Sequence, residues 1–293
     1  MRATKHFRII QITWIILILN FPARTFSQNI DDCDLKFITH LINTGSYKEA
    51  LFLLDSGDCA KFQMNDSINY LRGWSYYLLK QPAPSAENLI KIATGSALYP
   101  KSHFYASYNY AQSANLDKAE ESLNEMEPGS DSLISMKNYQ LAGIKLLRGN
   151  ISQFEEWFNN ADRSHYGLTD SYNSLLNLSG EMKKHKSKSP FAAGVMSGII
   201  PGSGKLYAGK KGEAATAFLS TVGLGLVTWE NYRKNGLNSF TTILFGSAFA
   251  VTYIANICGA VFSVRILETE YNANIKSTIL FHLRIPLDRT FGK

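Results

Sequence analysis

A glycine-rich stretch that ends in a lysine, Gly202-Ser203-Gly204-Lys205, comes closest to a known chemical motif. A phosphate-binding loop has another glycine five residues before the glycine that precedes the lysine. It also has a serine or threonine directly after the lysine. These two positions hold Ile199 and Leu206. The stretch therefore does not match a nucleotide-binding loop, and we expect no cofactor.

Other catalytic arrangements are also missing from the sequence. The six histidines show no pair four residues apart and no cysteine cluster nearby, so we expect no metal site. There is no Gly-x-Ser-x-Gly nucleophile elbow. The paired carboxylates Glu120-Glu121 and Glu155-Glu156 are most simply solvated helix faces. The sequence thus predicts no catalytic residues and a protein that is not an enzyme.

Cys33 and Cys59 form a possible disulfide among the three cysteines. In the helical arrangement expected below, Cys33 opens the first helix and Cys59 follows the second, and antiparallel helices bring those ends together. A bond there would contribute about 3 kcal/mol in an oxidising compartment. Two free buried thiols are the alternative.

Positive charge lies beside the apolar parts of the chain. Residues 29–182 carry a net charge of −7, whereas residues 1–28 carry +4 and residues 183–293 carry +9. Basic residues next to apolar segments are typical of contact with anionic lipid headgroups. We therefore expect membrane lipid, and no nucleic acid, among the partners.

Residues 1–27 have the features of an export signal. Basic residues precede an apolar run of 13 residues at 9–21, and Pro22 and the small-residue pattern Thr25-Phe26-Ser27 follow. The run is shorter than the ~20 residues of a spanning helix. We expect cleavage after Ser27 and export of the following domain, with an uncleaved signal-anchor as the alternative.

Residues 28–182 are expected to form helical hairpins at a fixed period. A turn followed by a helix recurs with marker positions at Ala50, Ala86, Ala119 and Phe154, which are 33 to 36 residues apart. A pair made of a small residue and then an aromatic one, Gly73 and Tyr76, returns 34 residues later as Ser107 and Tyr110.

This pattern resembles tetratricopeptide repeats, and we count four units. The resemblance implies an all-α stack of helical hairpins with a curved surface that binds a protein partner. A possible partner surface consists of Tyr70, Tyr77, Tyr105 and Tyr108. The alternative for each tyrosine is packing between helices.

Residues 189–264 are expected to form two or three transmembrane helices after a basic linker at 183–188. The apolar stretches are 191–200, 214–229 and 240–264, and the third has 25 residues without a charge. Two rows of small residues at four-residue spacing suggest close helix packing and a possible homo-oligomer. They are Gly194 and Gly198, continued by Gly202, and then Ala255, Gly259 and Ser263. Asn256 should face another helix, because an unpaired amide in hydrocarbon is costly.

The turn after the first stretch resembles that of the TM-two type of membrane domain. Its residues are Pro201, Gly202, Gly204, Tyr207, Gly209 and Gly212. The region 189–286 is also similar to an uncharacterised bacterial membrane domain that follows tetratricopeptide-like repeats in envelope proteins. Neither family implies catalysis. The tail spans 265–293, and within it residues 277–287 alternate in places between apolar and polar residues, which suggests a short strand or an interfacial extended segment.

Together these observations predict an envelope scaffold or adaptor. The exported repeats would bind an unidentified envelope protein, and the C-terminal bundle would hold them at the bacterial inner membrane, on the periplasmic side. The alternative is an accessory factor for membrane transport or membrane-protein insertion, in which the membrane bundle is the active part.

Overall fold

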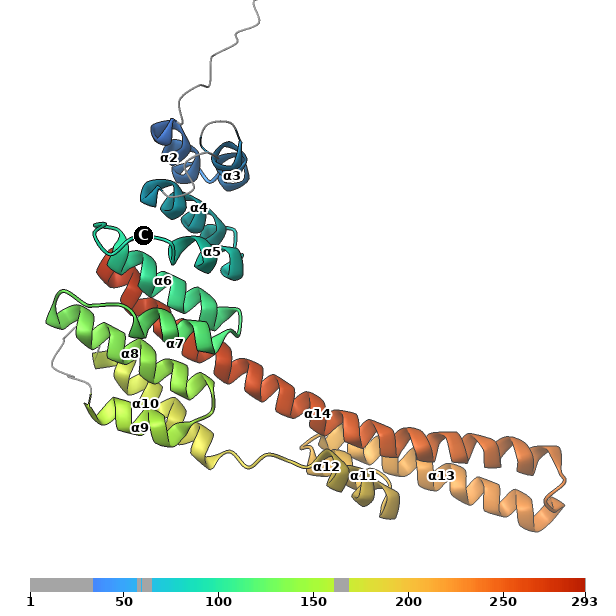
Figure 1. Ribbon diagram of the computed structural model, residues 1–293. Helices are drawn as coiled ribbons and strands as arrows, with labels where there is room; N and C mark the ends of the chain where they lie inside the picture. Colours follow the sequence, from blue (N-terminus) through green and yellow to red (C-terminus); the bar gives the residue numbers. More distant parts are fainter. Residues whose placement is uncertain (1–33, 57–58, 60–64, 161–168, 293) are drawn as a thin grey trace, which may run out of the picture.

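The described part of the chain is entirely helical. The computed structural model describes all residues except 1–33, 57–58, 60–64, 161–168 and 293. The described residues form thirteen helices and no strand, which confirms the predicted all-α class (Figure 1). The expected export signal and Cys33 lie outside the described residues.

Helices α2 to α9 form four antiparallel pairs, and α10 follows them. The pairs are α2 (Leu35–Asn43) with α3 (Tyr47–Asp55), α4 (Asp66–Leu78) with α5 (Pro82–Leu89), α6 (Tyr99–Gln112) with α7 (Leu116–Asn124), and α8 (Asp131–Leu147) with α9 (Ile151–Asn160); α10 spans Thr169–Lys184. We call α2 to α10 the N-terminal domain. The turn inside every pair contains one residue with positive φ, at Gly45, Lys80, Ala114 and Gly149. These turn residues are 34 or 35 positions apart, close to the spacing that the sequence predicts.

Small side chains allow the two helices of a pair to approach closely. The four marker residues are completely buried in the second helix of each pair; three are the small Ala50, Ala86 and Ala119, and the fourth pair has Phe154 instead. A Cβ atom on Gly73 would lie 2.6 Å from Leu89 Cγ, so any larger side chain would force α4 and α5 apart. At the equivalent position in the next pair, the Ser107 hydroxyl donates to the Ala119 carbonyl at 2.7 Å.

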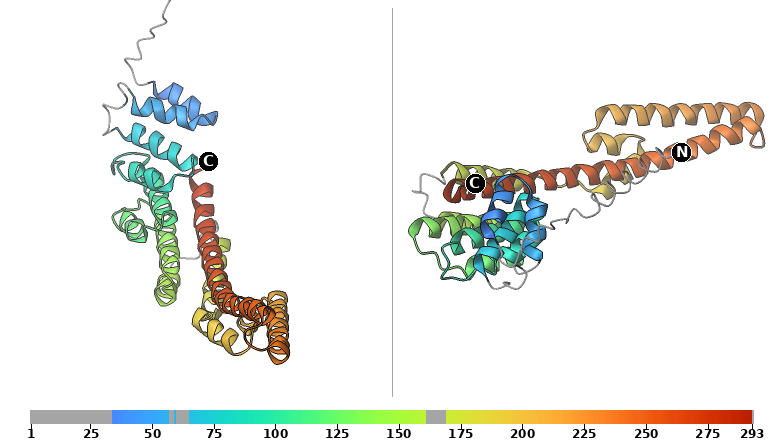
Figure 2. Two further views of the ribbon diagram at one scale, coloured as in Figure 1. Left: turned by 90° about the vertical axis from the view of Figure 1, so that its right-hand side faces the viewer. Right: turned by 90° about the horizontal axis from the view of Figure 1, so that it is seen from above.

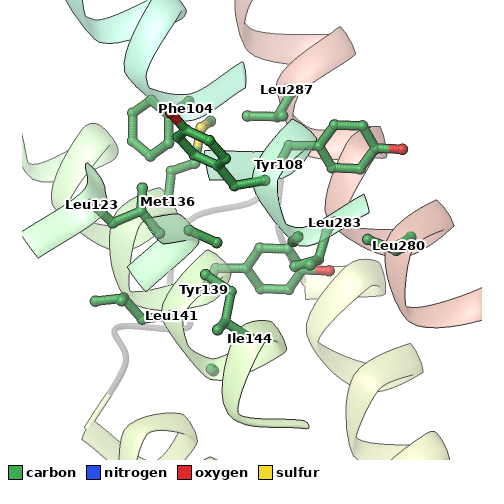
Figure 3. Packing of buried hydrophobic residues seen from close by; sticks show 14 of the residues in the cluster. Phe104, Tyr108, Leu123, Met136, Tyr139, Leu141, Ile144, Leu280, Leu283 and Leu287 are labelled. Atoms are coloured by element: carbon green, nitrogen blue, oxygen red, sulfur yellow. The ribbon is translucent and has the colours of Figure 1, made fainter. Parts of the chain in front are cut away.

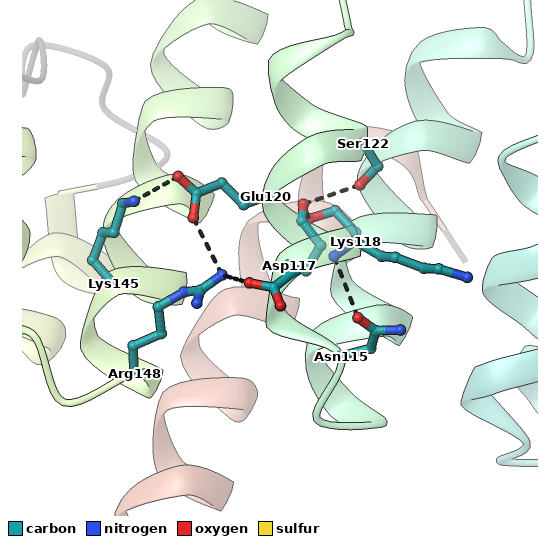
Figure 4. Close-up of polar contacts among 9 residues, drawn as sticks. Asn115, Asp117, Lys118, Glu120, Ser122, Lys145 and Arg148 are labelled. Carbon is teal, nitrogen blue, oxygen red and sulfur yellow. Dashed lines mark hydrogen bonds and ion pairs between the residues drawn. The ribbon is translucent and has the colours of Figure 1, made fainter.

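Ion pairs connect successive helix pairs at the surface. Lys145 on α8 contacts Glu120 on α7 at 2.5 Å, and Arg148 contacts Asp117 at 2.6 Å (Figure 4). Arg148 also lies 3.5 Å from Glu120. Glu120 is therefore held by two cations from the neighbouring pair, and its predicted role as part of a solvated helix face is incomplete.

Four further helices complete the chain. They are α11 (Pro190–Ile199), α12 (Ser203–Tyr207), α13 (Lys211–Asn235) and α14 (Phe240–Phe291). Helix α13 packs against the first half of α14, where Gly225 lies beneath the Phe249 ring. We call α11, α12, α13 and residues 240–264 of α14 the C-terminal bundle. It projects away from the N-terminal domain on the rod of α14 (Figure 2).

The C-terminal bundle exposes many large apolar side chains. Phe191, Ile199 and Phe240 are each more than three-quarters exposed. Among the described residues, α14 is the one helix long and apolar enough to cross a membrane, judged by length and composition; α11 is apolar but shorter. By itself, one such helix is weak evidence for a membrane anchor.

The second half of α14 leaves the C-terminal bundle and enters the core of the N-terminal domain. Ile275, Ile279, Leu283 and Leu287 are all buried there. The expected strand or extended segment in the tail is wrong, because α14 is continuous to Phe291. The four buried residues are spaced by four, which is a helical period, and only this face of the tail meets the core.

Leu283→Ala should lower the free energy of unfolding by about 2–5 kcal/mol, because it leaves a cavity where α14 meets the N-terminal domain. Urea unfolding in detergent micelles, followed by helical circular dichroism, measures the change. Phe281→Ala on the exposed side of the same turn is the control and should cost much less. Equal losses in the two variants would contradict the packing described here.

Candidate functional site

The second half of α14 occupies the face of the N-terminal domain that is formed by α6, α8 and α10. Two of these are the first helices of their pairs. A Cβ atom on Gly143 of α8 would overlap the Leu283 side chain, so the glycine creates the space into which this leucine fits. Leu283 lies beside Tyr139 in the buried cluster (Figure 3). The Tyr139 hydroxyl donates to the His282 carbonyl at 3.1 Å. The Tyr105 hydroxyl donates to Asp288 at 3.0 Å.

The four tyrosines of the predicted partner surface lie at or beside this contact. Tyr105 and Tyr108 are buried where α14 packs. Tyr70 and Tyr77 are partly buried and stack around Trp74, over which Lys101 lies at 4.6 Å. Burial and the nearby Asp288 carboxylate raise the pKa of Tyr77 to about 12. The chain's own helix therefore covers the α6 part of this surface, and Tyr77 stays neutral at physiological pH.

A second connection joins the two parts of the molecule at the middle of α14. Glu268 accepts a hydrogen bond from the Lys188 amide at 2.9 Å and contacts His185 Nε2 at 3.0 Å. The His185 ring stacks on Tyr271 with centroids 3.5 Å apart. Sequence reasoning did not identify this joint, because Glu268 is 83 positions from His185 and no local pattern links the two residues.

The predicted membrane turn is a break between α11 and α12 that the surrounding helices hold closely. Gly202 has a φ of +85°, and a Cβ atom there would overlap the Ala214 carbonyl oxygen. A Cβ atom on Gly204 would overlap the Ala193 carbonyl oxygen. The Gly204 amide instead donates to the Ser197 hydroxyl at 3.0 Å. Both glycines are therefore required by geometry.

Asn256 of α14 satisfies the backbone groups that this break leaves open. Its Oδ1 accepts from the Gly202 amide at 3.1 Å, and its Nδ2 donates to the Ser197 carbonyl at 3.3 Å. The prediction that Asn256 faces another helix is thereby confirmed. An orphaned amide or carbonyl in an apolar bundle would cost several kcal/mol.

The remaining residues of the turn motif have different roles. The Tyr207 hydroxyl accepts from the Ser189 amide at 3.2 Å, and its carbonyl accepts from Lys188 Nζ at 2.8 Å. Gly209 has a φ of +87°. Pro201 lies in the turn itself, and Gly212 has no heavy atom near its missing Cβ. Tyr207 thus fixes the basic linker to the C-terminal bundle.

The two rows of small residues divide between helix packing and other contacts. A Cβ atom on Gly194 would lie 2.9 Å from Val261 Cγ2 on α14. The Gly198 carbonyl accepts a hydrogen bond from the Tyr253 hydroxyl. Gly259 lies under the Lys205 side chain, 3.3 Å from Cε. Ala255 is exposed and Ser263 is buried.

The surface of the molecule has two concave sites, one in the C-terminal bundle and one on the first helix pair. A polar cleft of about 490 Å³ lies between α12, α13 and α14 and is lined by Lys205, Glu213 and Asn256 among others. An apolar groove of about 450 Å³ lies on α2 and α3, between Phe37 and Phe52. We call them the polar cleft and the apolar groove.

The structure also locates the residue types that bind metal ions and two of the three cysteines. No group of three His, Cys, Asp or Glu side chains there could hold a metal ion. Cys59 is buried and disulfide-bonded, and Cys258 is free. Cys33 lies outside the described residues, so its pairing with Cys59 stays a prediction.

No family model, no curated protein and no solved structure matches the chain.

Gly204→Ala should destabilise the protein by about 3 kcal/mol, because the added methyl group meets a backbone carbonyl that cannot rotate away. Thermal unfolding in detergent measures the loss. Gly212→Ala is the matched control eight residues on, with open space around it, and should leave the midpoint unchanged or slightly raised. A tolerated Gly204→Ala would contradict the close packing of the turn.

Acid should weaken the contacts that Glu268 makes with the Lys188 amide and with His185. The Lys188 amide and His185 hold the pKa of the Glu268 carboxyl below its usual 4.5. Because the pKa of Glu268 is lower in the folded protein than its ordinary value, the ionised carboxylate stabilises the fold. This stabilisation is complete above pH 4.5 and is lost as the pH falls through the pKa of the folded state. The difference in unfolding free energy between wild type and Glu268→Gln should therefore shrink as the pH falls below 4.5. Glu270→Gln, at an exposed carboxylate two positions away, should show no such change.

Proposed function

We propose that the protein is a membrane-anchored envelope scaffold, in which tetratricopeptide-like repeats bind a protein partner. The single observation that carries this proposal is the continuity of α14. One helix of 52 residues runs from the exposed apolar face of the C-terminal bundle into the buried core of the N-terminal domain. At 1.5 Å per residue its length is about 78 Å.

The regular turn spacing supports the assignment of α2 to α9 as repeats. Positive φ recurs at one residue in each turn, including Lys80 and Ala114, for which that conformation is costly. A side chain other than glycine is retained there only where the surrounding hairpin fixes the turn. The spacing of 34 or 35 residues fits stacked helical hairpins of the tetratricopeptide kind.

The exposed apolar residues support the assignment of the C-terminal bundle to a membrane. In water, exposed side chains such as Leu219, Val251 and Ile254 would form a large apolar surface. In a bilayer the same side chains meet lipid, and residues 240–264 are long enough to cross the hydrocarbon core. We infer that the bundle lies in the inner membrane, with the N-terminal domain on the periplasmic side.

The apolar groove is the surface we assign to the protein partner. Helix α14 ends beside Phe104 and Tyr105, so it does not reach the first pair. On that pair Phe52 is 72% exposed and Phe37 is 51% exposed. Lys48 and Glu49 edge the groove, which would give a bound peptide both an apolar anchor and polar contacts.

The alternative is an accessory factor for membrane transport or insertion, and one observation favours it. The polar cleft opens within a bundle whose other surfaces are mainly apolar. Polar side chains within a membrane segment are expensive and often functional.

Site-specific photocross-linking in intact cells tests both candidates. A photoreactive residue at Phe52 should give one discrete adduct with a protein, whereas a probe at Leu176, an exposed residue on α10, should give none. A probe at Ser220 in the polar cleft that captures a membrane polypeptide, with no adduct from position 52, would favour the alternative.

Absence of adducts from all three sites would count against partner binding. Release of the protein from membranes without detergent would overturn the anchor.

A further inference from the structure

In the proposed membrane placement, the polar cleft contains a lysine at the depth where the bilayer changes from hydrocarbon to headgroup. Lys205 lies over Gly259, which is five residues before the end of the apolar run at Val264. Five residues of helix rise by about 7–8 Å. The lysine thus lies just inside the interface on the side of the N-terminal domain, and only 20% of its side chain is exposed.

The charges around the cleft leave Lys205 available to a ligand. Glu213 contacts Lys210 at 3.2 Å but lies 4.0 Å from Lys205, which is beyond hydrogen-bond distance. The carboxylate is therefore balanced mainly by Lys210. The cleft is lined by two charged side chains, Lys205 and Glu213, and with Lys210 beside them the three groups carry one net positive charge.

The opposite wall carries hydroxyl groups. Thr216, Ser220 and Thr221 of α13 line it, together with Thr252 of α14. Thr221 is 1% exposed, and its hydroxyl has no hydrogen-bond partner among the described residues. A buried hydroxyl left unpaired costs about 1–3 kcal/mol, which a polar ligand in the cleft would offset.

The α13 amino terminus adds a favourable dipole to the same cleft. Helix α13 has 25 residues, and no side chain caps its first turn. Gly212, in that first turn, lines the cleft and leaves its backbone unobstructed. Backbone amides at a helix start attract phosphate groups.

We propose that the polar cleft binds the phosphate of an anionic glycerophospholipid headgroup, with Lys205 as the cation that holds it. This inference rests on the proposed membrane anchor and adds a specific lipid site to it. The lipid chains would lie along the exposed apolar sides of α13 and α14, where Phe218 and Val251 face outward. A free phosphate has the same headgroup chemistry but gains nothing from those side chains.

Binding of short-chain phospholipids to the full-length protein in non-ionic detergent tests the site. Native mass spectrometry of the delipidated protein should show phosphatidylglycerol bound about tenfold more tightly than a diacylglycerol with the same chains, which lacks the phosphate, because one charge-assisted hydrogen bond to the phosphate contributes about 1.5–3 kcal/mol. Lys205→Met keeps the aliphatic stem of the side chain and should abolish that preference. Lys211→Met, at an exposed lysine outside the cleft lining, should retain it.

A second variant and a ligand without acyl chains distinguish the possible outcomes of this experiment. Thr221→Val removes the unpaired hydroxyl at constant shape, and it should weaken phosphatidylglycerol binding even if Lys205→Met fails to fold. Glycerol phosphate without acyl chains should bind far more weakly than the lipid, and equal binding would overturn the lipid assignment. An unchanged preference in Lys205→Met or in Thr221→Val would overturn the site. Failure of the membrane anchor would appear separately, as wild-type protein that is soluble without detergent.

Discussion

Burial of the second half of α14 is the interaction on which the rest of the arrangement depends. Leu283 fits against Gly143 on α8, and the same helix face reaches Tyr105 and Tyr108 on α6. Without α14, these large side chains would line an open apolar surface. The helix therefore belongs to the core of the N-terminal domain as much as it belongs to the C-terminal bundle. Because an α-helix resists bending, the two parts cannot reorient freely.

The basic linker restricts the remaining freedom. It leaves α10 and is fastened to α14 by Glu268, then to the C-terminal bundle by Tyr207. A single rod would still let one part rotate about the helix axis. Two connections, the rod and the fastened linker, fix both the distance and the rotation. The basic residues that the sequence assigns to lipid contact thus include one, Lys188, with a structural role.

Sequence patterns predicted the local features of this protein well, because those features depend on residues close together along the chain. The turn-and-helix period located the helix pairs, and the glycines around position 202 located the break between α11 and α12. The tail was predicted wrongly because its apolar residues at 279, 281, 283 and 285 satisfy an alternating pattern as well as a helical one. Only the core formed by α6, α8 and α10 selects Ile279 and Leu283 for burial and leaves Phe281 exposed.

The predicted tyrosine surface shows the same dependence on distant contacts. The aromatic residues on α4 and α6 have the composition of a binding face, and those on α6 do contact a helix, but that helix is α14 of the same chain. What is left open lies beyond the buried end of α14, at the apolar groove on α2 and α3, and beside the first half of α14, at the polar cleft. Signal transfer between these two sites would need an element with two stable arrangements. Helix α14 is continuous and buried at one end, so the geometry favours a rigid spacer that holds one binding surface at a fixed distance from the other.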